Sequence, residues 1–255
     1  MNLVNIRDVK IGEGIPKVCV PIIGQTRADI LNSAKRVKFS GADLAEWRAD
    51  WYENIFFFAE AEKLVKELRE VLENIPLLFT FRTAKEGGKK AIVPQQYLEL
   101  NKKVIRTKAI DLVDVELFAG DSLVRKTIEI AHEENVKVVV SNHDFEKTPT
   151  KADIISRLCK MQKMGADISK IAVMPVCKKD VLTLLSATEE MYTEHADRPF
   201  VTMSMGRTGM ISRVCGEVFG SAITFGANGT ASAPGQMDVK DLQTMLRLMH
   251  GGLNI

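Results

Sequence analysis

A lysine placed early in an apolar run is the residue of this 255-residue chain whose type and position most suggest chemistry. Lys170 is followed directly by I-A-V-M, and lysine is almost never buried without a reason. Apolar surroundings disfavour an ammonium ion, and an amine that is partly neutral is nucleophilic. The position therefore predicts an amine suited to forming an imine with a ketone or an aldehyde.

A histidine and a glutamate elsewhere in the chain could complete such a site. His143 ends the run V-V-V-S-N-H, and Glu86 follows F-T-F-R-T-A-K. An imidazole titrates near neutral pH and can carry a proton, and a carboxylate commonly orients a catalytic imidazole and stabilises its charge. We therefore predict Lys170 as nucleophile, His143 as proton carrier and Glu86 as the partner of His143.

These residues lie in a regular alternation of short apolar runs and amphipathic segments. The eight apolar runs cover residues 18–24, 42–48, 76–82, 112–117, 137–143, 168–174, 200–206 and 221–227. Most carry apolar residues on both faces, which is typical of parallel strands buried on both sides. Segments between them repeat apolar residues at helical spacing, as in Leu64, Leu68 and Leu72.

The alternation predicts the architecture. Eight strand–helix repeats in about 250 residues favour a closed (β/α)8 TIM barrel over an open doubly wound sheet. Because no Pro- or Ser-rich linker divides the chain, we expect residues 1–255 to form a single domain. A short hairpin over residues 3–14 precedes the first barrel strand, and we expect it to cover the barrel bottom. The function of such a barrel sits at the C-terminal ends of its strands.

Composition and charge exclude several classes of protein. With 45% hydrophobic and 27% charged residues, the chain is not of the disordered class. Its 35 basic and 33 acidic residues give no reason to expect nucleic acid or a membrane surface as partner. The four cysteines are far apart and lack zinc-site spacing, and no apolar run approaches the ~20 residues of a membrane span. We expect a cytoplasmic protein with reduced thiols and no metal.

Charged residues at other strand ends allow two interpretations. They could bind a ligand, or they could form an ion-pair layer that fills the barrel. The residues in question are Glu46, Arg48, Asp114 and Glu116. Strand side chains alternate in direction, so Glu46 and Arg48 share one side of their strand, as Asp114 and Glu116 share one side of theirs. The residues alone leave both interpretations open.

Six segments carry a resemblance to a known family. They are E-W-R-A-D at 46–50, F-T-F-R-T-A-K-E-G-G at 79–88, V-S-N-H-D-F at 140–145, S-K-I-A-V-M-P at 169–175, M-G-R-T-G-M-I-S-R at 205–213, and F-G-A followed by A-S-A-P-G-Q at 225–236. In this order they resemble type I 3-dehydroquinate dehydratase over essentially the whole chain. The resemblance implies a (β/α)8 barrel without metal or cofactor, usually a homodimer, that acts on the small molecule 3-dehydroquinate in the shikimate pathway.

The resemblance also implies a mechanism. Lys170 forms an imine with the C3 ketone of 3-dehydroquinate. His143 removes a proton from C2 and helps to expel the C1 hydroxyl as water in a syn elimination, and Glu86 pairs with His143.

Substrate contacts follow from the same resemblance. It assigns the substrate carboxylate to Arg213, Ser232 and Gln236. It assigns the ring hydroxyls to Glu46, Arg48 and Arg82. It assigns an apolar pocket wall to Met203, Met205 and Phe225. A guanidinium fork matches a carboxylate with two hydrogen bonds, which agrees with the part given to Arg213.

The segment at residues 228–236 reads N-G-T-A-S-A-P-G-Q and consists of small residues with glycines around a proline. Such composition favours a segment whose ends can bend. It could be a lid that closes on the carboxylate through Ser232 and Gln236, or an ordinary loop into the last helix.

Two other functions stay open at this stage. One is an aldolase or transaldolase that also forms a lysine imine but cleaves a carbon–carbon bond. Its sugar-phosphate substrates need a phosphate site, and G-R-T-G at 206–209 could imitate one at a helix start. The other is a ligand-binding barrel without catalysis, which would not need an amine buried beside an imidazole.

Overall fold

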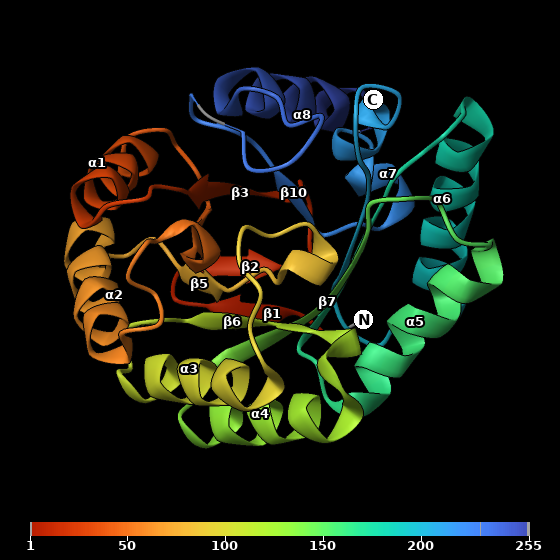
Figure 1. Ribbon diagram of the computed structural model, residues 1–255. Coiled ribbons are helices and arrows are strands. Elements are labelled where there is room, and N and C mark those ends of the chain that lie inside the picture. The colour runs from red at the N-terminus through yellow and green to blue at the C-terminus, as the bar shows by residue number, and fades with distance from the viewer. Residues whose placement is uncertain (1, 230, 254–255) are drawn as a thin grey trace.

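A computed structural model describes residues 2–229 and 231–253 and shows a central ring of parallel strands surrounded by helices (Figure 1). The strands are β3 (Lys17–Ile22), β4 (Leu44–Arg48), β5 (Leu77–Thr80), β6 (Leu112–Glu116), β7 (Lys137–Asp144), β8 (Ile168–Val173), β9 (Phe200–Ser204) and β10 (Ile223–Phe225). They pair in chain order and β10 returns to pair with β3. A parallel bridge between Phe200 and Ser221 closes the ring. The predicted (β/α)8 barrel is confirmed.

The strands are connected by helices that form the outer layer of the barrel. These helices are α1 (Arg27–Lys38), α2 (Phe58–Leu72), α3 (Pro94–Arg106), α4 (Asp121–Glu133), α5 (Lys151–Met164), α6 (Lys178–Glu190), α7 (Gly216–Phe219) and α8 (Val239–Leu253). Local sequence explains several of their ends. Thr26 and Asp29 form a reciprocal capping box at α1, Pro94 takes the first position of α3, and Gly165 ends α5 in the left-handed conformation. None of the helices in the described part of the chain is long and apolar enough to cross a membrane.

Short helical turns follow several strand ends and shape the upper rim. They are the 3-10 turns η1 (Ala49–Trp51), η2 (Ala84–Glu86), η3 (Leu117–Ala119) and η5 (Met210–Arg213). A π-helical turn, η4 (Met191–His195), extends α6 instead. The four rim turns lie just past β4, β5, β6 and β9, so they hold residues at the C-terminal ends of those strands.

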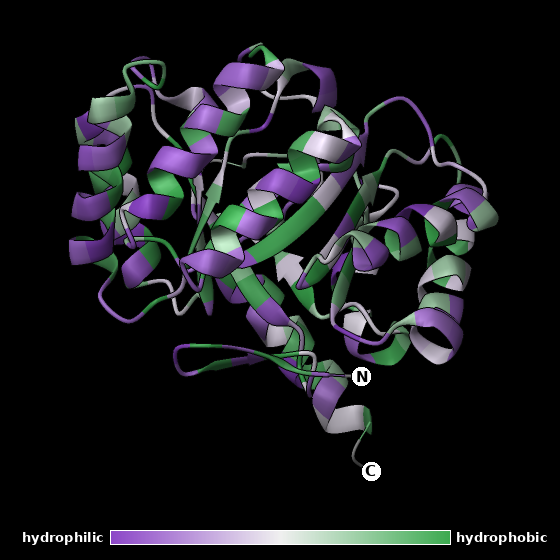
Figure 2. Ribbon diagram, turned by 90° about the horizontal axis from the view of Figure 1, so that it is seen from below, coloured by the Kyte–Doolittle hydropathy of each residue, from purple (hydrophilic) through white to green (hydrophobic). Residues whose placement is uncertain are grey.

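Alternate residues of each strand belong to two separate apolar clusters. Side chains such as Trp47 and Phe79 point outward and pack against the helices. Their neighbours Leu44, Leu78 and Leu112 point inward and form the lowest layer of the barrel interior. Figure 2 shows the central strands as mostly hydrophobic, and the helices as hydrophobic on one face and hydrophilic on the other. Polar side chains that point inward therefore lie above this apolar layer, towards the C-terminal ends of the strands.

The N-terminal hairpin closes one end of the barrel. It consists of β1 (Val4–Ile6) and β2 (Val9–Ile11), which pair in antiparallel fashion. Val4, Ile6 and Ile11 are buried in the same cluster as the lowest interior layer, and Figure 2 shows the hairpin lying across that end. The prediction that a short hairpin covers the barrel bottom is confirmed.

Candidate active site

Lys170 lies inside the barrel on β8 with only 4% of its surface exposed. Its Nζ is 3.5 Å from Asp114 Oδ2, 3.8 Å from Glu46 Oε1 and 4.5 Å from the centre of the Phe225 ring. The sequence suggested apolar surroundings for this amine. The structure corrects that expectation, because the inward alternation of β4 and β6 brings two carboxylates to the same height.

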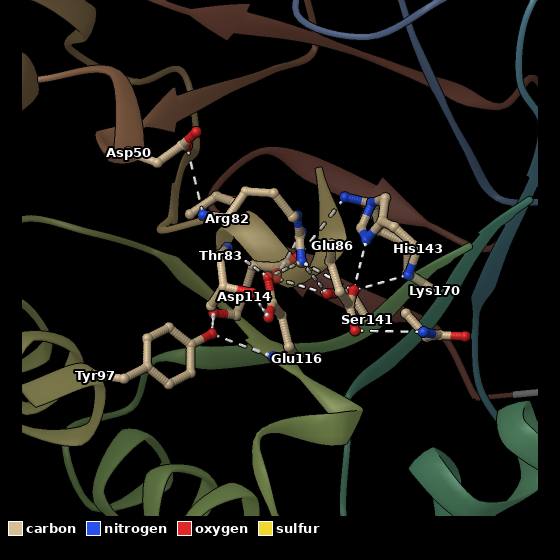
Figure 3. A network of polar contacts seen from close by, with 12 residues as sticks. Asp50, Arg82, Thr83, Glu86, Tyr97, Asp114, Glu116, Ser141, His143 and Lys170 are labelled. Atoms are coloured by element: carbon tan, nitrogen blue, oxygen red, sulfur yellow. Dashed lines mark hydrogen bonds and ion pairs between the residues drawn. The ribbon is translucent and has the colours of Figure 1, made fainter. Parts of the chain in front are cut away.

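His143 and Glu86 form a pair at the C-terminal end of the barrel, beside Lys170 (Figure 3). Glu86 lies in η2, and its Oε2 accepts the backbone N–H of His143 at 2.8 Å and lies 3.1 Å from His143 Nδ1. With Nδ1 turned towards the carboxylate, Nε2 is the nitrogen left to exchange a proton with a ligand.

The electrostatics of this pair favour a neutral imidazole. Burial, with Arg82 and Lys170 as nearby cations, holds the pKa of His143 well below its ordinary value. Burial also raises the pKa of Glu86 to about 7; Glu116 adds to this rise and Arg82 opposes it. The imidazole is therefore neutral near neutral pH, and its Nε2 is available to take a proton from a ligand.

Arg82 is the centre of a buried network that links three strands (Figure 3). Its guanidinium donates to Asp114 Oδ1 at 2.9 Å, to Glu116 Oε1 at 2.9 Å and to Ser141 Oγ at 3.0 Å. Burial alone would lower the pKa of Arg82, but Asp114 and Glu116 raise it well above its usual value. The ion-pair layer that the sequence allowed is therefore present for Asp114 and Glu116.

Arg48 is held by a residue for which the sequence predicted no role. Asp50 Oδ1 and Oδ2 accept from Arg48 Nε and Nη2 at 2.8 and 3.0 Å, a two-point contact that fixes the guanidinium plane. Arg48 Nη1 is then 3.5 Å from the carbonyl oxygen of Ser232. The signal was present in E-W-R-A-D, since Asp50 follows Arg48 by two residues and both point the same way.

Arg213 is a buried cation whose partners are carbonyl groups and a sulfur atom. It is 1% exposed, and it donates to Pro234 O at 2.9 Å and to Phe225 O at 3.3 Å. Its Nε is buried without a hydrogen-bond partner, and no carboxylate of the described residues lies within ion-pair distance. Burial lowers the pKa of Arg213 to about 10. A buried guanidinium in such surroundings favours an anionic ligand.

The segment at residues 231–236 lies over the site. Ser232 N–H donates to Gln236 Oε1 at 2.8 Å, and Gln236 Nε2 donates to Ser232 Oγ at 3.1 Å. The Pro234 carbonyl accepts from Gly206 N–H at 3.2 Å as well as from Arg213. Thr230, within the predicted lid, is outside the described residues. The described part is thus tied to the barrel rim by backbone groups.

A single cavity collects eleven of the twelve predicted site residues. The residues that line it are Lys170, His143, Glu86, Glu46, Arg48, Arg82, Met203, Met205, Phe225, Ser232 and Gln236. The twelfth, Arg213, lies behind the wall and contacts Met203 and Phe225. The structure therefore brings together residues that are up to 190 positions apart, from Glu46 to Gln236.

One group of residues elsewhere has donor atoms close enough for a metal ion. In the portion that the structure covers, Glu190, Glu194 and His195 at the end of α6 offer ligand atoms within 4.8 Å of one another. Glu190 already pairs with Lys151, and two of the three are exposed. Helix ends of this kind face the barrel bottom, so the group belongs to the opposite end from the cavity.

Comparison with known proteins agrees with this geometry. A family model described as type I 3-dehydroquinase matches residues 18–252. The chain belongs to the type I 3-dehydroquinase family. A 3-dehydroquinate dehydratase of Clostridioides difficile is 52% identical over 251 residues, which are 98% of both chains. One of Salmonella typhimurium is 50% identical over 98% of this chain and 99% of its own.

Solved structures of 3-dehydroquinate dehydratases share this fold closely. A Clostridium difficile type I enzyme with covalently modified comenic acid superimposes with a TM-score of 0.96 at 51% identity, over 98% of this chain and 99% of that one. A Geobacillus kaustophilus enzyme gives 0.95 at 36% identity, over 98% and 97%. A 3-hexulose-6-phosphate synthase gives 0.62 at 17% identity, which shows the barrel fold alone.

Proposed function

We propose that this enzyme dehydrates 3-dehydroquinate to 3-dehydroshikimate through an imine on Lys170, as a step of the shikimate pathway. The observation that supports it most directly is the meeting of a buried lysine amine and a His143–Glu86 pair in one cavity. Family membership and the names of the relatives favour dehydration over carbon–carbon bond cleavage or binding alone. The covalently modified ligand in the Clostridium difficile relative supports covalent chemistry.

The proposed reaction takes place on one face of the ring, where Lys170 holds the substrate and His143 makes both proton transfers. The Lys170 amine adds to the C3 ketone, and a proton delivered within the site lets the resulting hydroxyl leave as water, which gives an iminium ion that withdraws electrons from C2. His143 Nε2 then takes the C2 proton and returns it to the C1 hydroxyl, which departs as water while the double bond forms. Hydrolysis of the imine releases the conjugated enone and restores the amine. Glu86 stabilises the imidazolium ion between the two proton transfers.

Substrate orientation is assigned to the remaining predicted site residues. The proposal places the substrate carboxylate on Arg213, whose unpartnered Nε supports that role, with help from Ser232 and Gln236. It places the ring hydroxyls near Glu46, Arg48 and Arg82. Since three N–H contacts of Arg82 already serve protein groups, its part is to position Glu116 and Asp114 as much as to touch the ring. Met203, Met205 and Phe225 form the apolar wall.

The segment at 231–236 is assigned the role of a lid over the carboxylate. Its contacts with Arg48, Arg213 and Gly206 support closure over the imine. Limited proteolysis with and without saturating substrate analogue tests this role, because a closed lid resists cleavage. Unchanged cleavage within residues 228–236 would argue for an ordinary loop.

Borohydride reduction in the presence of 3-dehydroquinate tests the central claim. We expect peptide mass analysis to find a reduced substrate adduct on Lys170, and the Lys170→Ala variant to give neither adduct nor product while it still binds substrate. His143→Ala is expected to give the adduct but to stall before elimination, as followed by the absorbance of the enone. An adduct at another residue, or normal turnover by the histidine variant, would contradict the assignment.

The resemblance further predicts a homodimer in the cytoplasm. Light scattering at several protein concentrations measures the assembly, and a mass of about 57 kDa, twice the 28.4 kDa of one chain, is the expected result.

A further inference from the structure

We infer that Asn142 and Arg157 are positioning residues, which hold the Glu86 carboxylate in line with His143. The inference rests on the proposed function, since it concerns the groups that act through the catalytic pair. Neither residue lines the cavity of Lys170, and the sequence alone predicted no role for either.

Two hydrogen bonds in series connect Arg157, through Asn142, to the Glu86–His143 pair. Arg157, on α5, donates from Nη1 to Asn142 Oδ1 at 2.8 Å. Asn142, on β7, donates from Nδ2 to Glu86 Oε1 at 3.3 Å. Glu86 then uses Oε2 for both the backbone N–H and the Nδ1 of His143. Each oxygen of the carboxylate thus has its own partner, and the pair of contacts fixes its plane.

The guanidinium also decides which way the amide of Asn142 faces. Arginine has only donors, so Asn142 must present its oxygen to Arg157 and its NH₂ group to Glu86. Without Arg157, the amide could turn and present its oxygen to the carboxylate, which is repulsive. Asn142 is 3% exposed, so water offers little substitute. Arg157 is itself held, with Phe118 5.5 Å from its guanidinium carbon and Asp144 Oδ2 3.9 Å from Nη1.

The hydrogen bond from Asn142 affects the ionisation of Glu86, because the carboxyl group is buried among other charged groups. The charged groups that face the catalytic pair come from several strands and the segments after them, and are Arg48, Arg82, Glu116 and Lys170. Burial and Glu116 oppose the charged carboxylate, whereas the Asn142 amide and the His143 backbone N–H favour it. Loss of the Asn142 donor therefore makes Glu86 harder to ionise and raises its pKa.

The test is the pH dependence of kcat for matched variants. Asn142→Ala is expected to shift the acid side of the kcat profile to higher pH by about one unit. At a fixed pH on that side, kcat therefore falls about tenfold. The rate should approach the parental plateau at high pH. Asn142→Asp places a carboxylate beside Glu86 and should move the profile further. Arg157→Gln should move it in the same direction, and Arg157→Lys should restore part of the loss.

The double variant and two controls separate positioning from general damage. If Arg157 acts through Asn142, then Asn142→Ala with Arg157→Gln moves the profile no further than Asn142→Ala alone. Asn101→Ala removes a buried amide of α3 with no hydrogen-bond partner for either side-chain atom, and Arg125→Gln removes an exposed arginine of α4. Both controls should leave the pH profile where it is.

A kcat that falls equally at every pH, or an acid side that does not move, would overturn the inference. If Asn142→Ala does not fold, as judged by circular dichroism, then Arg157→Gln decides alone, because that side chain is 24% exposed and its loss leaves no large cavity. Borohydride labelling of the parent separates the two proposals. A label on Lys170 with unmoved profiles defeats only the positioning role, whereas no label on Lys170 defeats the proposed function and this inference together.

Discussion

Arg213 differs from the other buried arginines of the site in the kind of group that it contacts. Arg82 and Arg48 are each neutralised by carboxylates of the protein. Arg213 has carbonyl oxygens at 2.9 and 3.3 Å and an Nε without a partner. An isolated cation is costly to bury, so its protein surroundings stay incomplete until an anion arrives. The contrast supports Arg213 as the carboxylate anchor.

Replacement of Arg213 should therefore affect substrate binding more than chemistry. Hydrogen bonds to charged groups are worth ~1.5–3 kcal/mol, so Arg213→Leu is expected to raise KM for 3-dehydroquinate by about 10- to 100-fold. Steady-state kinetics with the enone absorbance measures both constants. Arg207→Leu is the matched control, since Arg207 is exposed and lies three residues before the turn that holds Arg213. A KM within twofold of the parent for Arg213→Leu would remove the anchor role.

The Glu86–His143 pair predicts a specific pH response. Because burial raises the pKa of Glu86 to about 7, its carboxylate is protonated below that pH and charged above it. The charged form supports the imidazolium ion, so kcat should rise with pH through about 7. Glu86→Gln should abolish this rise and lower the plateau about 100-fold, in the range of general acid–base help. If kcat of the Glu86→Gln variant still rises with pH near 7, the rise belongs to the titration of another group.

At the scale of elements, the proposed lid at residues 231–236 depends on how closely its backbone approaches that of the barrel rim. Gly235 has φ +78°, and a Cβ there would lie 2.4 Å from the carbonyl oxygen of Gly206. The neighbouring Pro234 carbonyl links the same lid to Gly206 and Arg213. Gly229 has φ +88° in the same segment, but a Cβ there would meet nothing within 4 Å. The two glycines thus share a left-handed backbone conformation and differ in what a Cβ would contact.

Alanine at these two positions separates strain from lid contact. Gly235→Ala should push the lid away from the rim and raise KM by about tenfold or more, because small misplacements of positioning groups are costly. Gly229→Ala carries the same left-handed penalty of ~1–2 kcal/mol but should leave KM within about twofold. Kinetics, together with proteolysis of residues 228–236, measures both effects. Equal changes in the two variants would show that backbone strain alone is responsible.

At the scale of the whole molecule, the barrel closes only when its first and last strands pair. β10 pairs with β3, more than 200 residues earlier, and the hairpin β1–β2 buries Ile11 against the lowest interior layer. No strand can be removed without opening an edge to water. This closure supports the prediction that residues 1–255 are one domain.

A single domain predicts one cooperative unfolding transition in urea. Far-ultraviolet circular dichroism reports the helices, and fluorescence reports Trp47 and Trp51 at the end of β4. The two curves should coincide, because the helices and the strand ends lose their packing together. Separate midpoints, or a stable proteolytic fragment of roughly half the chain, would indicate two units.

The sequence by itself determined the barrel and which strand residues share a face. The alternation of side chains along a strand puts Glu46 with Arg48, and Asp114 with Glu116, on one side without any knowledge of neighbours, because side-chain direction along a strand is a local property. The same holds for the hairpin, whose apolar residues recur before the first barrel strand. The resemblance supplied the remaining site residues, and the cavity contains all but Arg213.

Only the tertiary structure decided which inward residues meet at the same height. The stagger between barrel strands sets Asp114 beside Lys170 and Arg82, and it replaces the expected apolar surroundings with carboxylates. Helix packing sets Arg157 against Asn142, and the path of residues 231–236 brings Pro234 to Arg213. These contacts join residues from different elements, so their geometry depends on strand stagger and helix packing, which no local pattern in the chain encodes.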